Sequence, residues 1–415
     1  MLQGFLGIAG ILLVAWLFSE SKRHMRPVQI GLGIALQVVL TVLLLKVPFL
    51  KNWVQAANDV VGTIEKATGS ATAFMFGYLA GGDTPFQSIN PSANFIVAFR
   101  VLPLVLVMSA LSSLLFYWKV LPLVVRGMAF VLSRTLKISG ASGLAAAADV
   151  FLGIAEAPLF VRPYLPKMTR TELFMVMACG MASVAGTVMV LYASVLGPVI
   201  PDAIGHILVA SVISIPAALV LAQIMIPERS ESALQGEAWR VEKTADSSMD
   251  AIVKGTLDGV QMLINIIALI IVIFALVHLV NGALGSIGEI GGSPLSLERM
   301  LSYILRPFMW LMGVPAADLE TASKLMATKI LMNEFVAYLD MAKLPAGALS
   351  AKTRIIMTYG MCGFANLASL GILMGTLNSI IPERRKEVLG LGFRSLVAGN
   401  LATMMTGTLA GMILG

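Results

Sequence analysis

The chain has 415 residues, of which 58% are hydrophobic and only 13% are charged, and its formal net charge is +6. Soluble domains are about 25% charged, so this composition excludes an ordinary water-soluble enzyme. The basic residues lie mostly between apolar runs and form no continuous stripe, which argues against nucleic acid as a partner. The composition therefore predicts an all-α protein that is integral to the lipid bilayer.

Eight apolar segments are long enough to cross a bilayer as helices. A basic cluster around Lys22 and Arg26 follows the first segment, and another around Arg385 precedes the last. Because Lys and Arg favour the cytoplasmic face, we expect a multi-pass protein of the cytoplasmic (inner) membrane with both termini outside. The eight segments are 4–19, 29–49, 93–118, 171–199, 205–226, 258–284, 354–381 and 388–414.

The segments between these spans differ in character. Residues 51–67 and 120–137 mix charged and apolar positions, which predicts interfacial helices, whereas 227–254 is hydrophilic and is expected to be a cytoplasmic loop. The expected organisation has five parts. They are N-terminal scaffold and interfacial helices (1–137), a first unit (138–226), a cytoplasmic connector (227–256), a scaffold helix with an interfacial helix (257–319) and a second unit (320–415).

Two short apolar segments carry acidic residues. Residues 140–168 contain Asp149 and Glu156, and residues 320–345 contain Glu334. Ionisable groups at membrane depth are costly and for that reason are candidates for function, although each carboxylate could also be a satisfied structural group. Gly153 and Pro158 would stop a helix next to Glu156, and Glu334 follows Asn333 in a segment too short to cross the membrane and return as two full helices. We therefore expect both segments to form re-entrant hairpins.

An internal repeat supports this organisation. Residues 179–186 and 362–369 align without a gap, with Cys, Gly and two Ala in common, and each follows one of the acidic segments. Short broken segments in matching places of two halves are typical of inverted-repeat transporters, whose binding site lies near the bilayer midplane.

Other functions find little support in the sequence. It contains no phosphate-binding loop and no HExxH or GxSxG element, so we expect no enzymatic activity and no cofactor apart from a coupling cation. Cys179 and Cys362 both lie in apolar segments, which argues against a disulfide or a metal cluster. A channel is a further alternative, which accumulation of solute against a gradient would exclude.

Several strings resemble the concentrative nucleoside transporter family. The most specific are Asn-Glu-Phe-Val-Ala-Tyr at 333–338 and Cys-Gly-Phe-Ala-Asn at 362–366; others lie at 99–103, 151–159 and 392–395. The resemblance covers nearly the whole chain. It implies a homotrimer of eight-helix protomers, each with two re-entrant hairpins, that imports nucleosides together with sodium or protons.

The resemblance also implies roles for single residues. Glu334, Asn366 and Ser369 would bind the ribose hydroxyls, since a carboxylate accepts hydrogen bonds and an amide both donates and accepts. Glu156 and Val188 would lie beside the base, and Phe364 would form an apolar wall. For Val188 and Phe364, plain core packing is an alternative.

One departure from the family pattern concerns the base. Family members commonly have Gln-Thr immediately before the first glutamate, whereas this chain has Ile154 and Ala155, whose side chains form no hydrogen bonds. Recognition of the base therefore differs from the usual pattern. A symporter of the same fold for a different small polar solute is the alternative.

The second departure concerns the coupling cation. Asp149 stands where sodium-coupled members typically place Asn, and its expected companions are the Leu152 and Val184 carbonyls and the Ser183 hydroxyl. This all-oxygen set suits a hard cation. The carboxylate could hold sodium, or it could instead bind a proton. Of these two, the acidic side chain slightly favours the proton. Asp149 could also simply hydrogen-bond the backbone of its hairpin.

Overall fold

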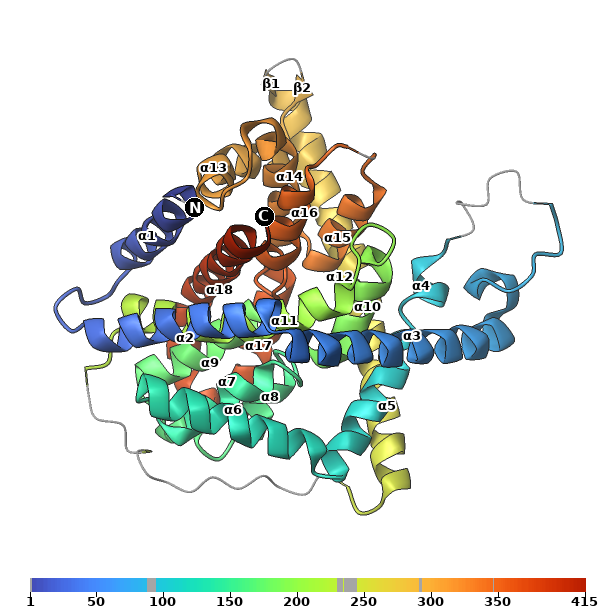
Figure 1. Cartoon of the computed structure of the whole chain (residues 1–415). Helices are drawn as coiled ribbons and strands as arrows, with labels where there is room; N and C mark the ends of the chain where they lie inside the picture. Colours follow the sequence, from blue (N-terminus) through green and yellow to red (C-terminus); the bar gives the residue numbers. More distant parts are fainter. Residues whose placement is uncertain (1, 88–94, 230–233, 235–244, 291–292, 346) are drawn as a thin grey trace.

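The computed structural model describes residues 2–87, 95–229, 234, 245–290, 293–345 and 347–415. Helices dominate these residues, and the strands among them, β1 (Glu289–Ile290) and β2 (Ser293–Pro294), form one short antiparallel pair (Figure 1). The prediction of an all-α membrane protein is confirmed.

All eight predicted spans coincide with helical segments. Within the described residues, six segments are long and apolar enough to cross a membrane. These are α2 (Pro27–Lys46), α4 (Val97–Arg100) with α5 (Leu104–Tyr117), α9 (Arg170–Ala182) with α10 (Gly186–Leu196), α11 (Ala203–Met225), α12 (Ser248–Ile287), and η5 (Pro382–Arg384) with α18 (Arg385–Leu414). The other two are the shorter α1 (Leu2–Leu17) and the interrupted pair α16 (Ala351–Gly360) and α17 (Leu367–Ile380).

The prediction of a loop over 227–254 is wrong for the C-terminal part of this range, which is helical. Helix α12 begins at Ser248, because the Ser247 hydroxyl caps it by accepting a hydrogen bond of 3.1 Å from the Asp250 backbone N–H. Most of the remaining loop lies outside the described residues. The first turns of α12 contain polar residues, so hydropathy alone does not show where this helix begins.

The two segments predicted to be interfacial helices are both helical. Helix α3 (Pro48–Phe76) is considerably longer than the predicted 51–67, and with η1 (Gly77–Ala80) and α4 it extends away from the main body of the molecule (Figure 1). Helix α6 (Val120–Leu136) matches its prediction closely. A third amphipathic helix, α13 (Leu297–Leu311), precedes η4 (Ala316–Asp318).

Each acidic segment folds as two short helices joined at a tip. Hairpin 1 comprises α7 (Gly140–Asp149), α8 (Glu156–Phe160) and η3 (Leu165–Lys167), and hairpin 2 comprises α14 (Leu319–Leu331) and α15 (Glu334–Lys343). No continuous helix passes through either glutamate, as predicted. Pro158 does not stop a helix, however. It occupies the first turn of α8, where a backbone N–H has no intrahelical partner.

The tip of hairpin 1 depends on a glycine conformation. Gly153 has φ +93°, and a Cβ atom built there would lie 2.7 Å from the Cβ of Ala185. We expect Gly153→Ala to cost roughly 1–2 kcal/mol for the left-handed backbone and about 1–3 kcal/mol for overpacking. The melting temperature of the purified protein in detergent should fall. Gly69→Ala is the matched control, because a Cβ at Gly69 meets nothing within 4 Å; equal melting temperatures for the two variants would contradict this account.

The two interrupted helices meet at their breaks. We call residues 183–185 the first break and 361–366 the second break. The Phe364 N–H donates to the Ser183 carbonyl across 3.1 Å, so the breaks satisfy part of each other's backbone. Helix α18 packs against both, since a Cβ on its Gly399 would lie 2.5 Å from the Cβ of Met181 and 3.0 Å from that of Ala365.

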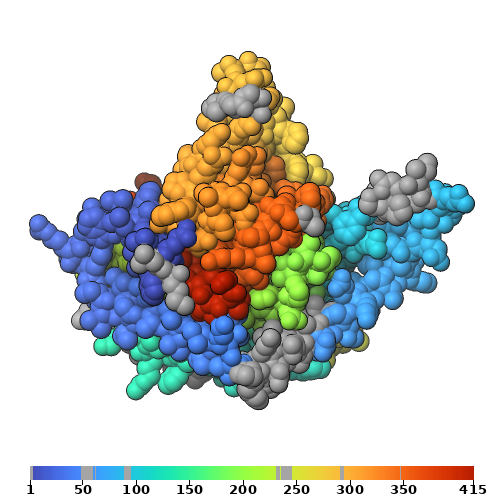
Figure 2. Space-filling view, turned by 45° about the horizontal axis from the view of Figure 1, so that its top comes forward, coloured from blue at the N-terminus to red at the C-terminus, as the bar shows by residue number. Residues whose placement is uncertain are grey.

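Burial divides the helices into two groups. Helices α9, α11 and α18 are almost entirely buried, whereas α12 is barely buried and packs mainly against α5. Figure 2 shows the C-terminal end of α12 projecting with α13 from the rest of the molecule. The α5–α12 pair is thus less buried than the helices that pack around the hairpins.

An ion-pair cluster connects the end of α1 and the start of α9 with α18. The Glu20 carboxylate, just after α1, accepts hydrogen bonds of 3.2 Å from Nε and 2.8 Å from Nη2 of Arg170 at the start of α9. Arg394 of α18 lies 3.2 Å from the same carboxylate. The hydrogen bond with Arg170 is the main cause that lowers the pKa of Glu20.

Candidate functional site

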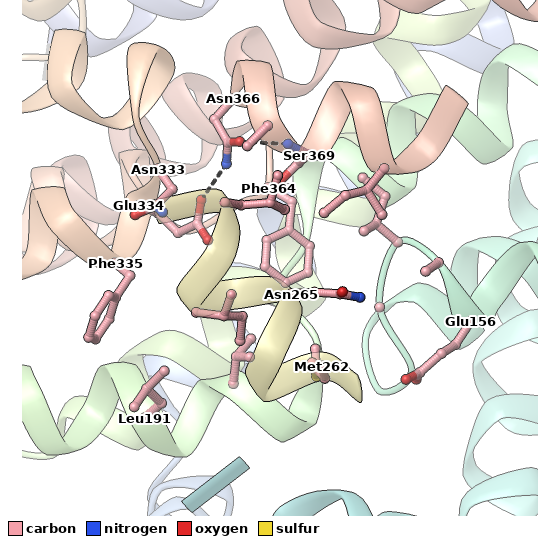
Figure 3. A pocket seen from close by; sticks show the side chains of 18 of the residues that line it. Glu156, Leu191, Met262, Asn265, Asn333, Glu334, Phe335, Phe364, Asn366 and Ser369 are labelled. Atoms are coloured by element: carbon pink, nitrogen blue, oxygen red, sulfur yellow. Dashed lines mark hydrogen bonds between the residues drawn. The ribbon is translucent and has the colours of Figure 1, made fainter. Parts of the chain in front are cut away.

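A cavity of about 470 Å³ lies between α12 and the tips of both hairpins (Figure 3). Its size falls within the range of about 300–1,000 Å³ that is usual for small-molecule sites. Side chains of hairpin 1, α10, α12, hairpin 2 and the second break line it. All eight residues predicted to bind substrate are among them: Ile154, Ala155, Glu156, Val188, Glu334, Phe364, Asn366 and Ser369.

Glu334 is a buried carboxylate with two internal donors. It is the first residue of α15, whose N-cap Asn333 accepts a hydrogen bond of 2.9 Å from the Val336 N–H. Its Oε1 accepts from the Tyr192 hydroxyl, and its Oε2 accepts from Nδ2 of Asn366 at 2.8 Å (Figure 3). The N-terminal end of a helix favours a negative charge, so the fold provides a place for an anionic acceptor.

Asn366 connects this carboxylate to the second break. It is the N-cap of α17, and its Oδ1 accepts a hydrogen bond of 2.8 Å from the Ser369 N–H while its Nδ2 donates to Glu334. The structure thus brings the three predicted ribose-binding residues to one end of the cavity.

The predicted base-side residues lie toward the other end. Ile154 and Ala155 precede Glu156 at the tip of hairpin 1, and Phe364 lies between the Glu334 end and the Glu156 end of the cavity (Figure 3). Val188 and Phe364 are buried and also line the cavity, so their positions fit core packing and an apolar binding wall equally.

Asp149 is the last residue of α7 and is only 1% exposed, yet neither carboxylate oxygen has a hydrogen-bond partner. A Cβ on Gly180 would lie 3.4 Å from its Oδ1, so the carboxylate sits against α9. A buried carboxylate without a donor costs several kcal/mol unless a cation or a proton neutralises it. The alternative in which this side chain hydrogen-bonds the hairpin backbone does not match the geometry.

The predicted companions of Asp149 are partly engaged elsewhere. The Ser183 hydroxyl donates to the carbonyls of Cys179 at 3.0 Å and Asp149 at 3.2 Å, and the Val184 carbonyl accepts from the Ser211 hydroxyl at 3.3 Å. Both oxygens keep a lone pair with which to contact a cation. Leu152 lines the cavity between α12 and the hairpin tips. In the described parts of the chain, no three His, Cys, Asp or Glu side chains form a metal site.

Two neighbours of Glu334 are not among the predicted site residues. Tyr192 lies 142 residues away along the chain and has no local signal that indicates the contact. Lys329 is completely buried on α14, and its Nζ donates to Oδ1 of Asn400 at 2.7 Å. Asn400 in turn donates to the Ala365 carbonyl at 3.0 Å. The rule that singled out the buried acids, an ionisable group at membrane depth, would also have found Lys329.

Three polar residues of α12 were also missed. Asp258, Gln261 and Asn265 line the cavity opposite the hairpins. They are spaced three and four residues apart, which places them on one helix face. That spacing was a usable signal within the apolar run predicted at 258–284.

Comparison with known proteins identifies the family. Three family models match the chain. The model described as Na⁺ dependent nucleoside transporter N-terminus matches residues 6–79, and the model described as nucleoside recognition matches residues 98–199. The model described as Na⁺ dependent nucleoside transporter C-terminus matches residues 206–411. The putative nucleoside permease NupX of Escherichia coli is 34% identical, with 100% of this chain and 99% of that protein covered. The nucleoside permease NupC of Helicobacter pylori is 33% identical, with 99% and 97% covered.

The fold is also that of a solved transporter. The structure of CNTnw in an inward-facing substrate-bound state matches with a TM-score of 0.90 and 32% sequence identity, covering 99% of this chain and 97% of that one. The chain therefore belongs to the Na⁺ dependent, or concentrative, nucleoside transporter family, and is a membrane transporter and not an enzyme.

Proposed function

We propose that this protein is a symporter that imports nucleosides across the cytoplasmic membrane, driven by a proton or sodium gradient. The observation that carries the proposal is the buried Glu334 carboxylate at one end of an otherwise largely apolar cavity, held by Tyr192 and Asn366. Such an acceptor suits a solute with adjacent hydroxyl groups. Both termini would lie outside, and the protein would work as a homotrimer.

The ribose would bind at the Glu334 end. An ionised carboxylate has about four lone-pair positions, and the protein donors Tyr192 and Asn366 occupy two of them. The 2′ and 3′ hydroxyls would donate to the remaining positions, and the hydroxyl of Ser369 would contact the same sugar. Tyr192 and Asn366 would hold the carboxylate in place before the substrate arrives.

Asp149 would be the coupling residue. Since its two carboxylate oxygens lack donors, either Na⁺ or a proton would remove the cost of the buried charge. The Ser183 hydroxyl and the Val184 and Leu152 carbonyls would complete a sodium site. If a proton neutralises Asp149, these oxygens need not bind any ion.

The helices would have two different roles, which correspond to the expected parts of the chain. The hairpins with the helices that follow them, 138–226 and 320–415, would form the two transport repeats around the substrate. The exposed α12, most of which lies in the expected part 257–319, would form the scaffold and the contacts between protomers together with α5.

One uptake experiment tests this proposal. Proteoliposomes containing the purified protein should accumulate labelled uridine or adenosine above the external concentration when a sodium or proton gradient is imposed separately. Accumulation excludes a channel, and the gradient that drives it identifies the coupling ion. If neither nucleoside is accumulated or competed, the alternative of a same-fold symporter for a different small polar solute is favoured.

Restoring the missing polar pair tests the placement of the base. With Ile154→Gln and Ala155→Thr, we expect uridine to bind several-fold more tightly, because each new donor or acceptor pairs an edge of the base that is otherwise unpaired. The inhibition constant of uridine is the measurement, and size-exclusion chromatography shows whether the hairpin still folds. A folded double variant with unchanged discrimination among bases would count against this placement.

A further inference from the structure

The wall of the cavity opposite the hairpins carries a polar stripe. Asp258, Gln261 and Asn265 of α12 line the cavity on three successive turns, while their neighbours on that face, such as Met262 and Ile266, are apolar. Polar side chains are costly in a membrane helix, and those that occur usually face a cavity or a pathway for solute. The stripe lies across the cavity from Ile154 and Ala155, where hairpin 1 offers no side-chain hydrogen bonds.

Asn265 is held in a defined orientation. Gln261 Nε2 donates to Asn265 Oδ1 at 3.0 Å, which leaves the amide N–H donors of Asn265 directed to the cavity. Figure 3 shows the Asn265 side chain extending from α12 past Phe364 toward the tip of hairpin 1. A ligand ring that lies beside Phe364 would therefore present its edge to this amide.

The same end of the cavity contains two carboxylates. Glu156 at the tip of hairpin 1 and Asp258 on α12 are close enough to interact electrostatically, and both line the cavity. When it is ionised, the Asp258 carboxylate only accepts hydrogen bonds. This end of the cavity thus combines a carboxylate acceptor and an amide donor on the same helix.

We propose that α12 recognises the base through Asn265 and Asp258, in place of the polar pair missing from hairpin 1, and that it selects nucleosides whose base carries an exocyclic amino group. The proposal rests on the function proposed above, that this cavity binds nucleosides. In cytosine and adenine the amino group donates and the adjacent ring nitrogen accepts. The amino group would donate to Asp258, while Asn265, about 10 Å further along α12, would donate to another acceptor on the edge of the base. In uracil and hypoxanthine both positions are reversed, so a carbonyl would face the Asp258 carboxylate.

Matched pairs of nucleosides provide the test. Cytidine and uridine, like adenosine and inosine, differ mainly in these two positions. In proteoliposomes we expect cytidine and adenosine to inhibit uptake roughly tenfold more strongly than uridine and inosine, as for one hydrogen bond to a charged group. Inhibition constants within about twofold of each other in both pairs would overturn the proposal.

Variants of α12 assign the preference to residues. Asp258→Asn should bring the two members of each pair to similar affinity, because an amide both donates and accepts. Asn265→Leu should weaken cytidine and adenosine by roughly 3–10-fold. Ile264→Ala, an exposed change outside the cavity, should leave the ratios unchanged. A preference that persists unchanged in both Asp258→Asn and Asn265→Leu would overturn the assignment.

Equilibrium binding measurements show whether a failure concerns the proposed function or only this inference. Equilibrium binding of labelled cytidine in detergent reports on any variant that has lost transport. If no nucleoside binds the wild-type protein, the proposed function fails and this inference fails with it. If all four nucleosides bind equally and Glu334→Gln abolishes that binding, the proposed function stands and this inference alone fails.

Discussion

Glu334→Gln is expected to abolish concentrative uptake of ribonucleosides while the protein stays folded. A hydrogen bond to a charged acceptor contributes about 1.5–3 kcal/mol, against about 1 kcal/mol for a neutral one, and two ribose hydroxyls would depend on this carboxylate. The substitution also changes the internal contacts, because a Gln amide nitrogen cannot accept from Tyr192 or Asn366 as the carboxylate does. Affinity should fall at least tenfold.

The measurement is uptake into proteoliposomes together with size-exclusion chromatography of the variant. Glu320→Gln is the matched control. Glu320 lies on the same hairpin but is exposed and pairs with Lys324 at 2.7 Å, so its replacement should leave uptake near the wild-type level. Nucleosides that lack the 2′ or 3′ hydroxyl should lose part of the same binding energy. Wild-type transport of ribonucleosides by Glu334→Gln would refute the ribose assignment.

Asp149→Ala is expected to uncouple uptake from its driving gradient. The carboxylate is buried without a hydrogen-bond donor. A cation or a proton must therefore neutralise it before the substrate-loaded protein can change between its outward-facing and inward-facing states at a low cost in free energy. If the proton is the driver, uptake in sodium-free buffer should rise as the external pH falls, and a protonophore should collapse it. If sodium is the driver, uptake should saturate with sodium near neutral pH.

Asp149→Asn distinguishes the two drivers further. An amide does not titrate, so a proton-driven protein should lose its dependence on pH in this variant. A sodium-driven protein should keep its sodium dependence, because the amide oxygen still serves as a ligand. If Asp149→Ala retains the wild-type dependence on both gradients, Asp149 is not the coupling residue and has only a structural role.

The sequence by itself determined most of the helices and where two of them break, but not the start of α12 or the full length of α3. Long apolar runs require helices in a bilayer, and Asn333 and Asn366 mark helix starts because their short side chains cap the N-terminal N–H groups of α15 and α17. The internal repeat around Cys179 and Cys362 indicated that the two breaks are equivalent, and the breaks do meet, through Phe364 and Ser183. These features depend on local chemistry, which a sequence displays directly.

Only the tertiary structure decided which side chains surround the candidate site. Tyr192 reaches Glu334, and Lys329 reaches Asn400, across long stretches of sequence. Helical periodicity can place Asp258 and Asn265 on one face of α12, but it does not say what that face meets. Contacts between helices depend on how whole surfaces pack, and that information is distributed over the entire chain and absent from any single segment.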